Sequence, residues 1–223
     1  MSNEQDNTPD FDAIAVGAGF AGLALIHYLR DAGLSVRVFD RAADIGGTWT
    51  WNRYPGAMTD SESYYYCLTF SKELLQQWSW TQRYPDWKET LDYMHFVADK
   101  CDMRRDIQLN TEIASADYQA DSGHWLVTTG DGDQYTCKYF ISAMGMISEP
   151  VIPKVQGMDT FNGPLFHSSR WPEDLDYAGK RVGILGAGAT TVQMVPVMAQ
   201  TAESVTVFQR TPNFILPAMQ KPM

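Results

Sequence analysis

Two glycine-rich runs have the spacing with which proteins hold the pyrophosphate of a dinucleotide. They are residues 17–22 (GAGFAG) and residues 186–191 (GAGATT). In a G-x-G-x-x-G run the first glycine makes a tight turn, the second lets the backbone approach the pyrophosphate, and the third lets a helix pack closely on a strand. The following helix directs its free N–H groups and the positive end of its dipole at the anion. The competing interpretation is a glycine turn that only packs, because the run alone is a weak signal.

The residues that end the strand after each run differ, and this difference predicts two different nucleotides. Asp40 follows the first run, and a carboxylate there can accept hydrogen bonds from the ribose hydroxyls of FAD. Arg210 follows the second run, and a guanidinium there can pair with the 2′-phosphate of NADPH. The alternative for Arg210 is a solvated charge at a strand end. Thr191 replaces the third glycine of the second run, so either the helix stands off from the strand or the site is weakened.

The elements around these runs predict an α/β fold with two Rossmann-like dinucleotide-binding domains. Apolar runs over residues 11–16 and 35–39 flank a helix-periodic stretch that stops at Gly33, which makes a β-α-β unit. The second unit has expected strands at 180–185 and 204–208 and an expected helix at 192–202. Residues 45–70 predict a loop, and residues 71–103 predict helix with a break near Pro85. Residues 107–144 alternate like a β-meander, with strands expected at 107–109, 115–119, 125–129 and 135–142.

Prolines after Glu149 place an expected domain boundary there. We expect a disordered tail over residues 1–10, an FAD-binding domain with the added β-meander over 11–149, and an incomplete, truncated NADPH domain over 150–223. Two strands and one helix cannot cover their own apolar faces, so the sequence predicts a chain that stops in mid-domain.

Composition excludes several classes of partner. The chain has 223 residues, with 17 basic and 27 acidic side chains and a net charge of −10. So acidic a protein is a poor partner for nucleic acid. The three cysteines show neither metal-ligand nor redox C-x-x-C spacing, so we expect no metal. The polar start resembles no signal peptide and no apolar run is long enough to cross a bilayer, which predicts a cytoplasmic protein without membrane partners.

Five motifs in order resemble those of the Baeyer–Villiger monooxygenases of the cyclohexanone and phenylacetone monooxygenase type. The most specific is the fingerprint FxGxxxHxxxWP, whose defined positions are Phe161, Gly163, His167, Trp171 and Pro172. The others are the second glycine run and residues 46–49 (GGTW), 52–56 (NRYPG) leading to Asp60, and 208–212 (FQRTP). The resemblance runs from about residue 11 to residue 217.

The resemblance implies a role for each matching position. FAD would be contacted by Gly17, Gly19, Phe20, Gly22, Asp40, Gly47, Thr48 and Trp49, and NADPH by Gly186, Gly188, Thr190, Gln193, Arg210 and Thr211. Asp60 would lie near both cofactors and orient a catalytic arginine that comes from a later segment. His167 and Trp171 would belong to the linker that couples nicotinamide binding to domain motion. Tyr66 is the expected flavin contact in the aromatic stretch 64–70, with a plain core role as the alternative.

The activity that the resemblance implies is oxygen insertion into ketones, giving esters or lactones through a flavin peroxide, with NADPH and O₂ as co-substrates. Such a chain would be a fragment or one half of a split enzyme, inactive without its C-terminal half. Three alternatives stay open. A monooxygenase that oxidises nitrogen or sulfur is disfavoured by Trp171-Pro172, and a dithiol reductase by the lack of a cysteine pair after Gly47. The third is a non-catalytic nucleotide-binding remnant, which Thr191 favours.

Overall fold

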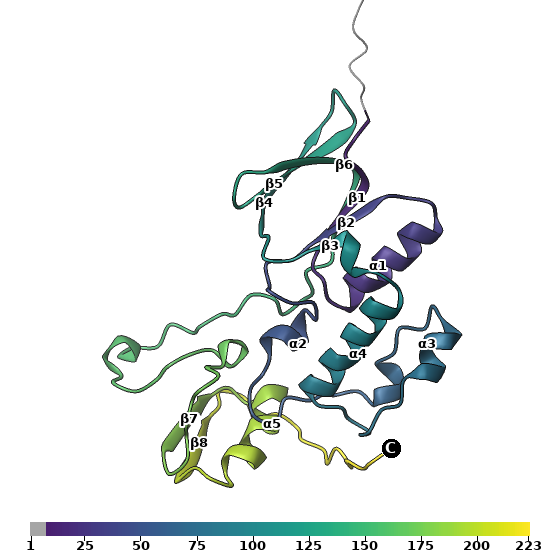
Figure 1. Ribbon diagram of the computed structural model, residues 1–223. Coiled ribbons are helices and arrows are strands. Elements are labelled where there is room, and N and C mark those ends of the chain that lie inside the picture. The colour runs from purple at the N-terminus through teal and green to yellow at the C-terminus, as the bar shows by residue number, and fades with distance from the viewer. Residues whose placement is uncertain (1–7) are drawn as a thin grey trace, which may run out of the picture. The chain divides into compact units, whose positions relative to one another are not determined.

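A computed structural model describes residues 8–223, and they form two compact units (Figure 1). The first unit holds the described residues up to Thr50, with Leu68–Gln77 and Leu91–Ser148. The second holds Trp51–Cys67, Trp78–Thr90 and Glu149–Met223. Most of the tail expected over residues 1–10 lies outside the described residues.

The helices are short and separated by long connections. The α-helices are α1 Phe20–Asp31, α2 Thr48–Trp51, α3 Lys72–Gln77, α4 Trp87–Lys100 and α5 Ala189–Met198. The 3₁₀ turns are η1 Ser63–Tyr65, η2 Arg104–Asp106, η3 Met158–Thr160 and η4 Ser168–Arg170. The break expected near Pro85 falls between α3 and α4. The loop expected over residues 45–70 was partly wrong, because it contains α2 and η1.

The first unit is built on a six-stranded sheet with the order β3-β2-β1-β6-β5-β4. The strands are β1 Phe11–Val16, β2 Val36–Phe39, β3 Ile107–Gln108, β4 Ile113–Gln119, β5 His124–Thr129 and β6 Gln134–Ser142. The pairs β1–β2, β1–β6 and β2–β3 are parallel, whereas β4–β5 and β5–β6 are antiparallel. Placing residues 107–109 in the meander was therefore wrong, since β3 extends the parallel part of the sheet. The meander consists of β4, β5 and β6 (teal in Figure 1).

The core of the first unit lies around its central strand. Ala13, Ile14 and Ala15 of β1 are fully buried, because β1 is paired on both edges and covered on both faces. Ile14 packs with Phe39 and Val127, and α1 lies against β1 and β2. This parallel, doubly covered strand is the element that carries the first glycine turn at its carboxyl end.

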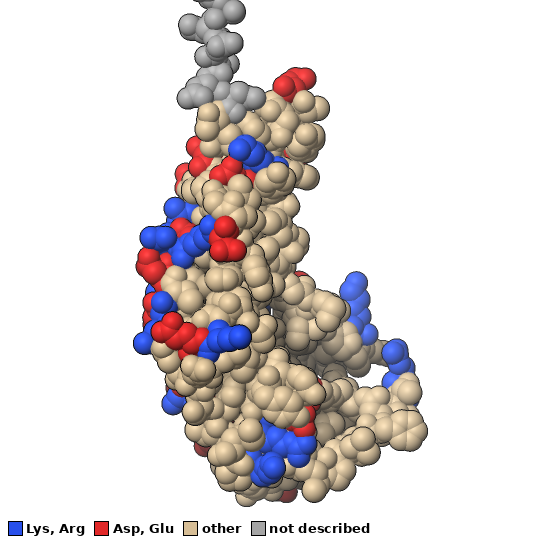
Figure 2. Space-filling model, turned by 90° about the vertical axis from the view of Figure 1, so that its right-hand side faces the viewer, with Lys and Arg blue, Asp and Glu red and all other residues tan. Residues whose placement is uncertain are grey.

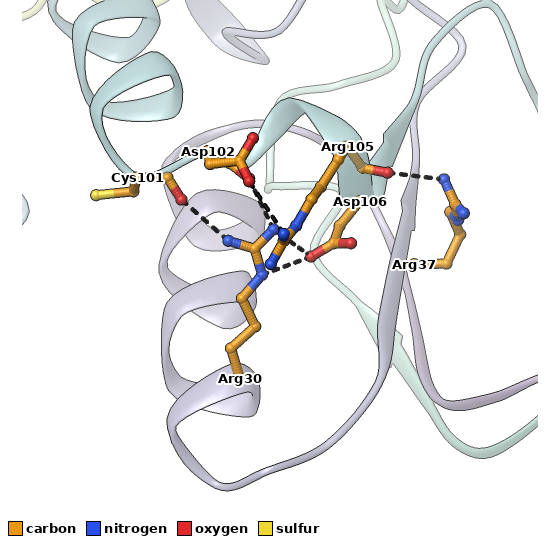
Figure 3. A network of polar contacts seen from close by, with 6 residues as sticks. All are labelled: Arg30, Arg37, Cys101, Asp102, Arg105 and Asp106. Atoms are coloured by element: carbon orange, nitrogen blue, oxygen red, sulfur yellow. Dashed lines mark hydrogen bonds and ion pairs between the residues drawn. The ribbon is translucent and has the colours of Figure 1, made fainter.

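Arg30, in the last turn of α1, fastens that helix to the segment after α4 (Figure 3). Its Nε donates to Asp106 Oδ2 at 2.6 Å, while its terminal nitrogens donate to the carbonyl oxygens of Cys101 at 3.0 Å and Asp102 at 2.8 Å. The Arg30 and Asp106 side chains are only 23% and 21% exposed. A planar guanidinium suits this task, because its donors reach several acceptors at fixed angles.

We expect Arg30→Ala to lower the free energy of unfolding by about 2–4 kcal/mol, since it leaves the half-buried Asp106 carboxylate without its cation. Arg30→Lys should recover only part of this, because an ammonium group cannot reach all three acceptors. Urea denaturation measures both. Arg105→Ala is the control: Arg105 pairs with Asp102 at 65% and 70% exposure, so its loss should cost less than about 0.5 kcal/mol. Equal losses at positions 30 and 105 would contradict the assignment.

The second unit contains a two-stranded parallel sheet, β7 Arg181–Leu185 and β8 Ser204–Phe208, with α5 between them in the chain. The expected helix at 192–202 begins and ends earlier than predicted, at Ala189 and Met198. The core of the second unit comprises Tyr54, Ala57, Met194 and Met198, and Trp171 and Val182 pack against it. Leu185 and Phe208 stay more than half exposed, as expected for so small a sheet.

Charged side chains of both signs are mixed on the surface. On the face drawn in Figure 2, blue and red side chains are interspersed along its left-hand edge. The ion pairs at the surface include Arg104–Asp99 and Arg105–Asp102. A phosphate-bearing ligand must therefore be held by local groups, not by a broad basic field. None of the helices in the described part of the chain combines the length and the apolar composition that a bilayer crossing requires.

Candidate functional site: two nucleotide-binding turns

The first glycine turn has the strained backbone that its spacing predicts. Gly17 has φ +111° and donates its N–H to Phe39 O at 2.8 Å. A Cβ on Gly17 would lie 2.5 Å from Ala143 O, and one on Gly22 would lie 2.1 Å from Gly17 O. α1 then begins after Gly19 with no side-chain cap and no acidic residue in its first turn. The turn thus presents a helix N-terminus that suits an anion.

Asp40 lies at this turn, as predicted, and makes contacts that sequence analysis missed. Its Oδ2 accepts from Ala18 N at 2.6 Å and its Oδ1 accepts from Ala42 N at 2.8 Å. The residue is 7% exposed. The carboxylate therefore braces the glycine turn against the end of β2, and each oxygen keeps a further lone pair for a ligand hydroxyl.

The segment that contains Gly47 closes over the same turn. Gly46 N donates to Ala18 O at 3.0 Å. A Cβ on Gly47, which has φ +54°, would lie 3.0 Å from Gly19 Cα. Thr48 is exposed and Trp49 is 6% exposed, so the indole packs inward at the start of α2. The two backbone segments therefore pack closely on each other, which explains why glycine is present at positions 19 and 47.

Phe20 and Tyr66 were expected to contact the flavin, and they lie in different units. Phe20 stacks on Tyr93 of α4, with ring centroids 6.1 Å apart. Tyr66 belongs to the second unit, where it is half-buried and its N–H donates to Ser63 O at 2.9 Å. The role of each toward a flavin stays a prediction.

The second glycine turn repeats the backbone geometry of the first. Gly186 has φ +114° and donates to Phe208 O at 2.8 Å, matching Gly17 and Phe39. Gly188 precedes α5 in an extended conformation without a side-chain cap. Cβ atoms on Gly186 and Gly188 would meet nothing within 4 Å, so this turn is open to a ligand. Arg210 and Thr211 are exposed after the end of β8.

Thr191 shows how the second turn tolerates the loss of its third glycine. Its Oγ1 donates to Gly186 O at 3.0 Å, and the residue is 8% exposed. In the first turn the corresponding Cβ would stand 2.1 Å from the carbonyl oxygen. The start of α5 therefore stands further from its turn than the start of α1 does. The hydroxyl spans the wider gap, which agrees with the expectation of a helix that stands off; whether the site is weakened stays a prediction.

We expect Thr191→Val to lower the free energy of unfolding of the second unit by about 1–2 kcal/mol, because Gly186 O loses a buried donor at unchanged side-chain volume. Thr191→Ser keeps the hydroxyl and should lose less than Thr191→Val. Thermal unfolding followed by circular dichroism compares them. A Ser variant no more stable than the Val variant would show that the hydrogen bond contributes nothing.

Gln193 connects α5 to Asp60 within the second unit. Gln193 Nε2 donates to Asp60 Oδ1 at 2.7 Å, and Gln193 Oε1 accepts from Tyr54 Oη at 2.8 Å. Burial raises the pKa of Tyr54; a hydrogen bond with Thr190 opposes this shift and the Asp60 charge adds to it. Tyr54 was missed by sequence analysis, although it lies within the 52–56 motif.

Two of the fingerprint residues, His167 and Trp171, make contacts that fix the connecting segment of the second unit. His167 precedes η4, and its Nδ1 accepts from Ser169 N at 3.2 Å. Trp171 meets the rings of Phe166 and Tyr177 edge-on and packs on the core of this unit. Phe161 is exposed and covers Gly163, where a Cβ would lie 2.8 Å from the Phe161 ring. Pro172 is exposed.

Comparison with known proteins agrees with this geometry. A model of the family described as flavin-binding monooxygenase-like matches residues 12–222. A Baeyer–Villiger monooxygenase of Pseudooceanicola batsensis is 44% identical over all of this chain and 42% of its own length. A phenazine N-monooxygenase of Lysobacter antibioticus is 45% identical over 93% of this chain and 39% of its own length.

Solved structures of monooxygenases also resemble this chain. The crystal structure of a cyclohexanone monooxygenase from Rhodococcus sp. Phi1 bound to NADP⁺ matches with a TM-score of 0.91 at 42% identity. That match covers 97% of this chain and 41% of the other. The chain thus spans about two fifths of the relatives that it matches, and the expected α/β fold with Rossmann-like units is confirmed. It belongs to the flavin-binding monooxygenase-like family.

Proposed function

We propose that this chain binds FAD at its first glycine turn and NADPH at its second, as part of a monooxygenase that uses O₂ to oxidise ketones to esters or lactones. The observation that carries the proposal is the pair of turns. Gly17 and Gly186 share their positive φ and their hydrogen bond to the following strand, but the first turn is braced by a carboxylate and the second is followed by Arg210.

The residues of the first turn fit FAD. The glycine turn leads into the uncapped N-terminus of α1, whose N–H groups can bind a pyrophosphate, and the unused lone pairs of Asp40 can accept ribose hydroxyls. FAD, when bound, supplies the redox chemistry between NADPH and O₂. The contribution of the chain is to hold and orient the cofactor and to keep water away from it.

The residues of the second turn fit NADPH. Gly186 and Gly188 leave the turn open, and the N-terminus of α5 offers uncapped N–H groups to a pyrophosphate. Arg210 and Thr211 are exposed and free to turn toward a 2′-phosphate. An arginine there selects NADPH over NADH, because the guanidinium forms two charge-assisted hydrogen bonds with a phosphate.

The test is binding by the purified chain. After incubation with FAD and gel filtration, retained flavin absorbance supports the first site, and loss of the flavin at micromolar protein removes the support. Titration with NADP⁺ and NAD⁺ tests the second site. Arg210→Ala should abolish the preference for NADP⁺ while leaving NAD⁺ affinity unchanged; equal affinity of the unaltered chain for both would overturn the assignment of Arg210.

A second candidate, oxidation of nitrogen in a heteroaromatic ring, is favoured by the 45% identity to the phenazine N-monooxygenase. Sequence identity of this size to both kinds of enzyme does not distinguish oxidation of a ketone from oxidation of a ring nitrogen. Turnover of a cyclic ketone and of a phenazine by the protein that contains this chain distinguishes the two. We further propose that the protein is cytoplasmic, as its composition and its free cysteines indicate.

A further inference from the structure

The segment that leads to Asp60 lies directly on α5. Gly56 has φ +82°, and a Cβ there would lie 2.4 Å from Gln193 O and 2.9 Å from Val197 Cγ2. Tyr54 and Ala57 are buried in the same core as Met194 of α5. This close approach explains why glycine is needed at position 56, and it brings the side chain of Gln193 under the segment.

The amide of Gln193 is fully used by that segment. Its Oε1 accepts from Tyr54 Oη at 2.8 Å and from Met58 N at 3.3 Å. Its Nε2 donates to Met58 O at 3.0 Å and to Asp60 Oδ1 at 2.7 Å. A glutamine amide has two N–H donors and two lone pairs on its oxygen, and all four find partners here. None is left for a bound nucleotide.

The orientation of this amide is fixed by its partners. Ionised Asp60 only accepts hydrogen bonds, so the NH₂ group must face it. Tyr54 stays protonated, because burial raises its pKa, and it donates to the oxygen end. Asp60 itself is exposed, so the amide holds one carboxylate oxygen while the other remains available to a ligand.

We propose that Gln193 is a positioning residue. It orients the Asp60 carboxylate and holds segment 54–60 on α5, and it affects NADPH binding only through Asp60 and that segment. The identity of the cofactor in this inference rests on the proposed function, whereas the hydrogen-bond network of Gln193 is independent of it. The glycine turn at 186–188 leads directly into α5, and Gln193 lies within that helix, so the same element carries the nucleotide turn and the group that fixes Asp60.

A swapped pair tests this. Gln193→Glu removes the donors to Asp60 Oδ1 and to Met58 O and sets two carboxylates against each other. Asp60→Asn in the same chain restores the hydrogen bond between positions 193 and 60, with donor and acceptor exchanged, but not the one to Met58 O. Hydrogen exchange of the Met58 amide reports on the segment without any cofactor. We expect exchange to rise about tenfold or more in Gln193→Glu and to return part of the way in the double variant.

The affinity of the chain for NADP⁺ is the second readout. It should fall about tenfold in Gln193→Glu and recover in the double variant, because the pair is coupled. If Gln193 instead contacts the nucleotide directly, the double variant stays as weak as Gln193→Glu and Met58 exchange does not change, which overturns the proposal. Gln200→Leu is the control, since Gln200 is exposed and its side chain donates to Pro196 O within its own turn. If the unaltered chain does not bind NADP⁺, the proposed function fails, while the exchange experiment still decides the role of Gln193.

Discussion

Gly22→Ala will lower the free energy of unfolding by about 3 kcal/mol or more and abolish retention of FAD. The added Cβ would stand 2.1 Å from Gly17 O and 3.1 Å from Gly17 C, both backbone atoms of the turn. Neither can move without breaking the hydrogen bond from Gly17 N to Phe39 O or displacing α1 from β2. Urea denaturation and flavin absorbance after gel filtration measure the two effects.

Gly188→Ala is the matched control for this prediction. Gly188 has a negative φ, and a Cβ there would meet nothing within 4 Å. Stability should therefore change by less than about 0.5 kcal/mol. The affinity for NADP⁺ should still fall, because the methyl group occupies the space through which the pyrophosphate approaches the backbone. A Gly22→Ala chain as stable as Gly188→Ala would show that helix and turn can separate at no cost.

Asp40→Ala will cost about 3–5 kcal/mol of stability, and it will weaken FAD binding beyond detection. Both carboxylate oxygens accept from backbone N–H groups, and Ala18 N and Asp40 itself are buried. Removing the carboxylate leaves two donors without partners in the wall of the proposed FAD site. Thermal unfolding of the chain, with and without FAD, measures this loss.

Asp40→Asn separates the charge from the hydrogen bonds. An asparagine can accept from only one of the two N–H groups and turns a donor toward the other, so it should be nearly as damaging as alanine. Asp99→Ala is the control, since the Asp99 side chain is 59% exposed and pairs with Arg104 at the surface. A fully stable Asn variant would mean that Asp40 serves the ribose alone.

Much of the fold could be predicted where the signal is local. The expected strand over 11–16 coincides with β1, because a continuous apolar run bounded by a glycine turn specifies a buried parallel strand. The expected strand over 204–208 coincides with β8, although most of the residues of β8 are exposed. The two residues of β3 could not be placed. Ile107–Gln108 pairs with β2, and a strand this short carries no period that shows which neighbour it joins.

The candidate site was predictable in its residue types and not in its contacts. The glycines and Asp40 follow from spacing, because the turn permits few alternatives. The hydroxyl of Thr191 on Gly186 O, and the amide of Gln193 beneath Met58, depend on where a helix start stands relative to a loop. No sequence pattern indicates that distance, so the hydrogen bonds of Thr191 and Gln193 are known only from the structure.

The order of strands in the first sheet has a consequence for how the chain folds. One edge of β1 pairs with β2, which follows soon after it in the chain. The other edge of β1 pairs with β6, in a register that places Phe11 opposite Cys137. Closing so long a loop is entropically costly and slow compared with the local pairing. During synthesis, an apolar strand therefore emerges with one edge unsatisfied until more than a hundred further residues have followed. We expect this interval to make nascent chains depend on chaperones, and a circularly permuted variant in which residues 107–142 are synthesised earlier would shorten it.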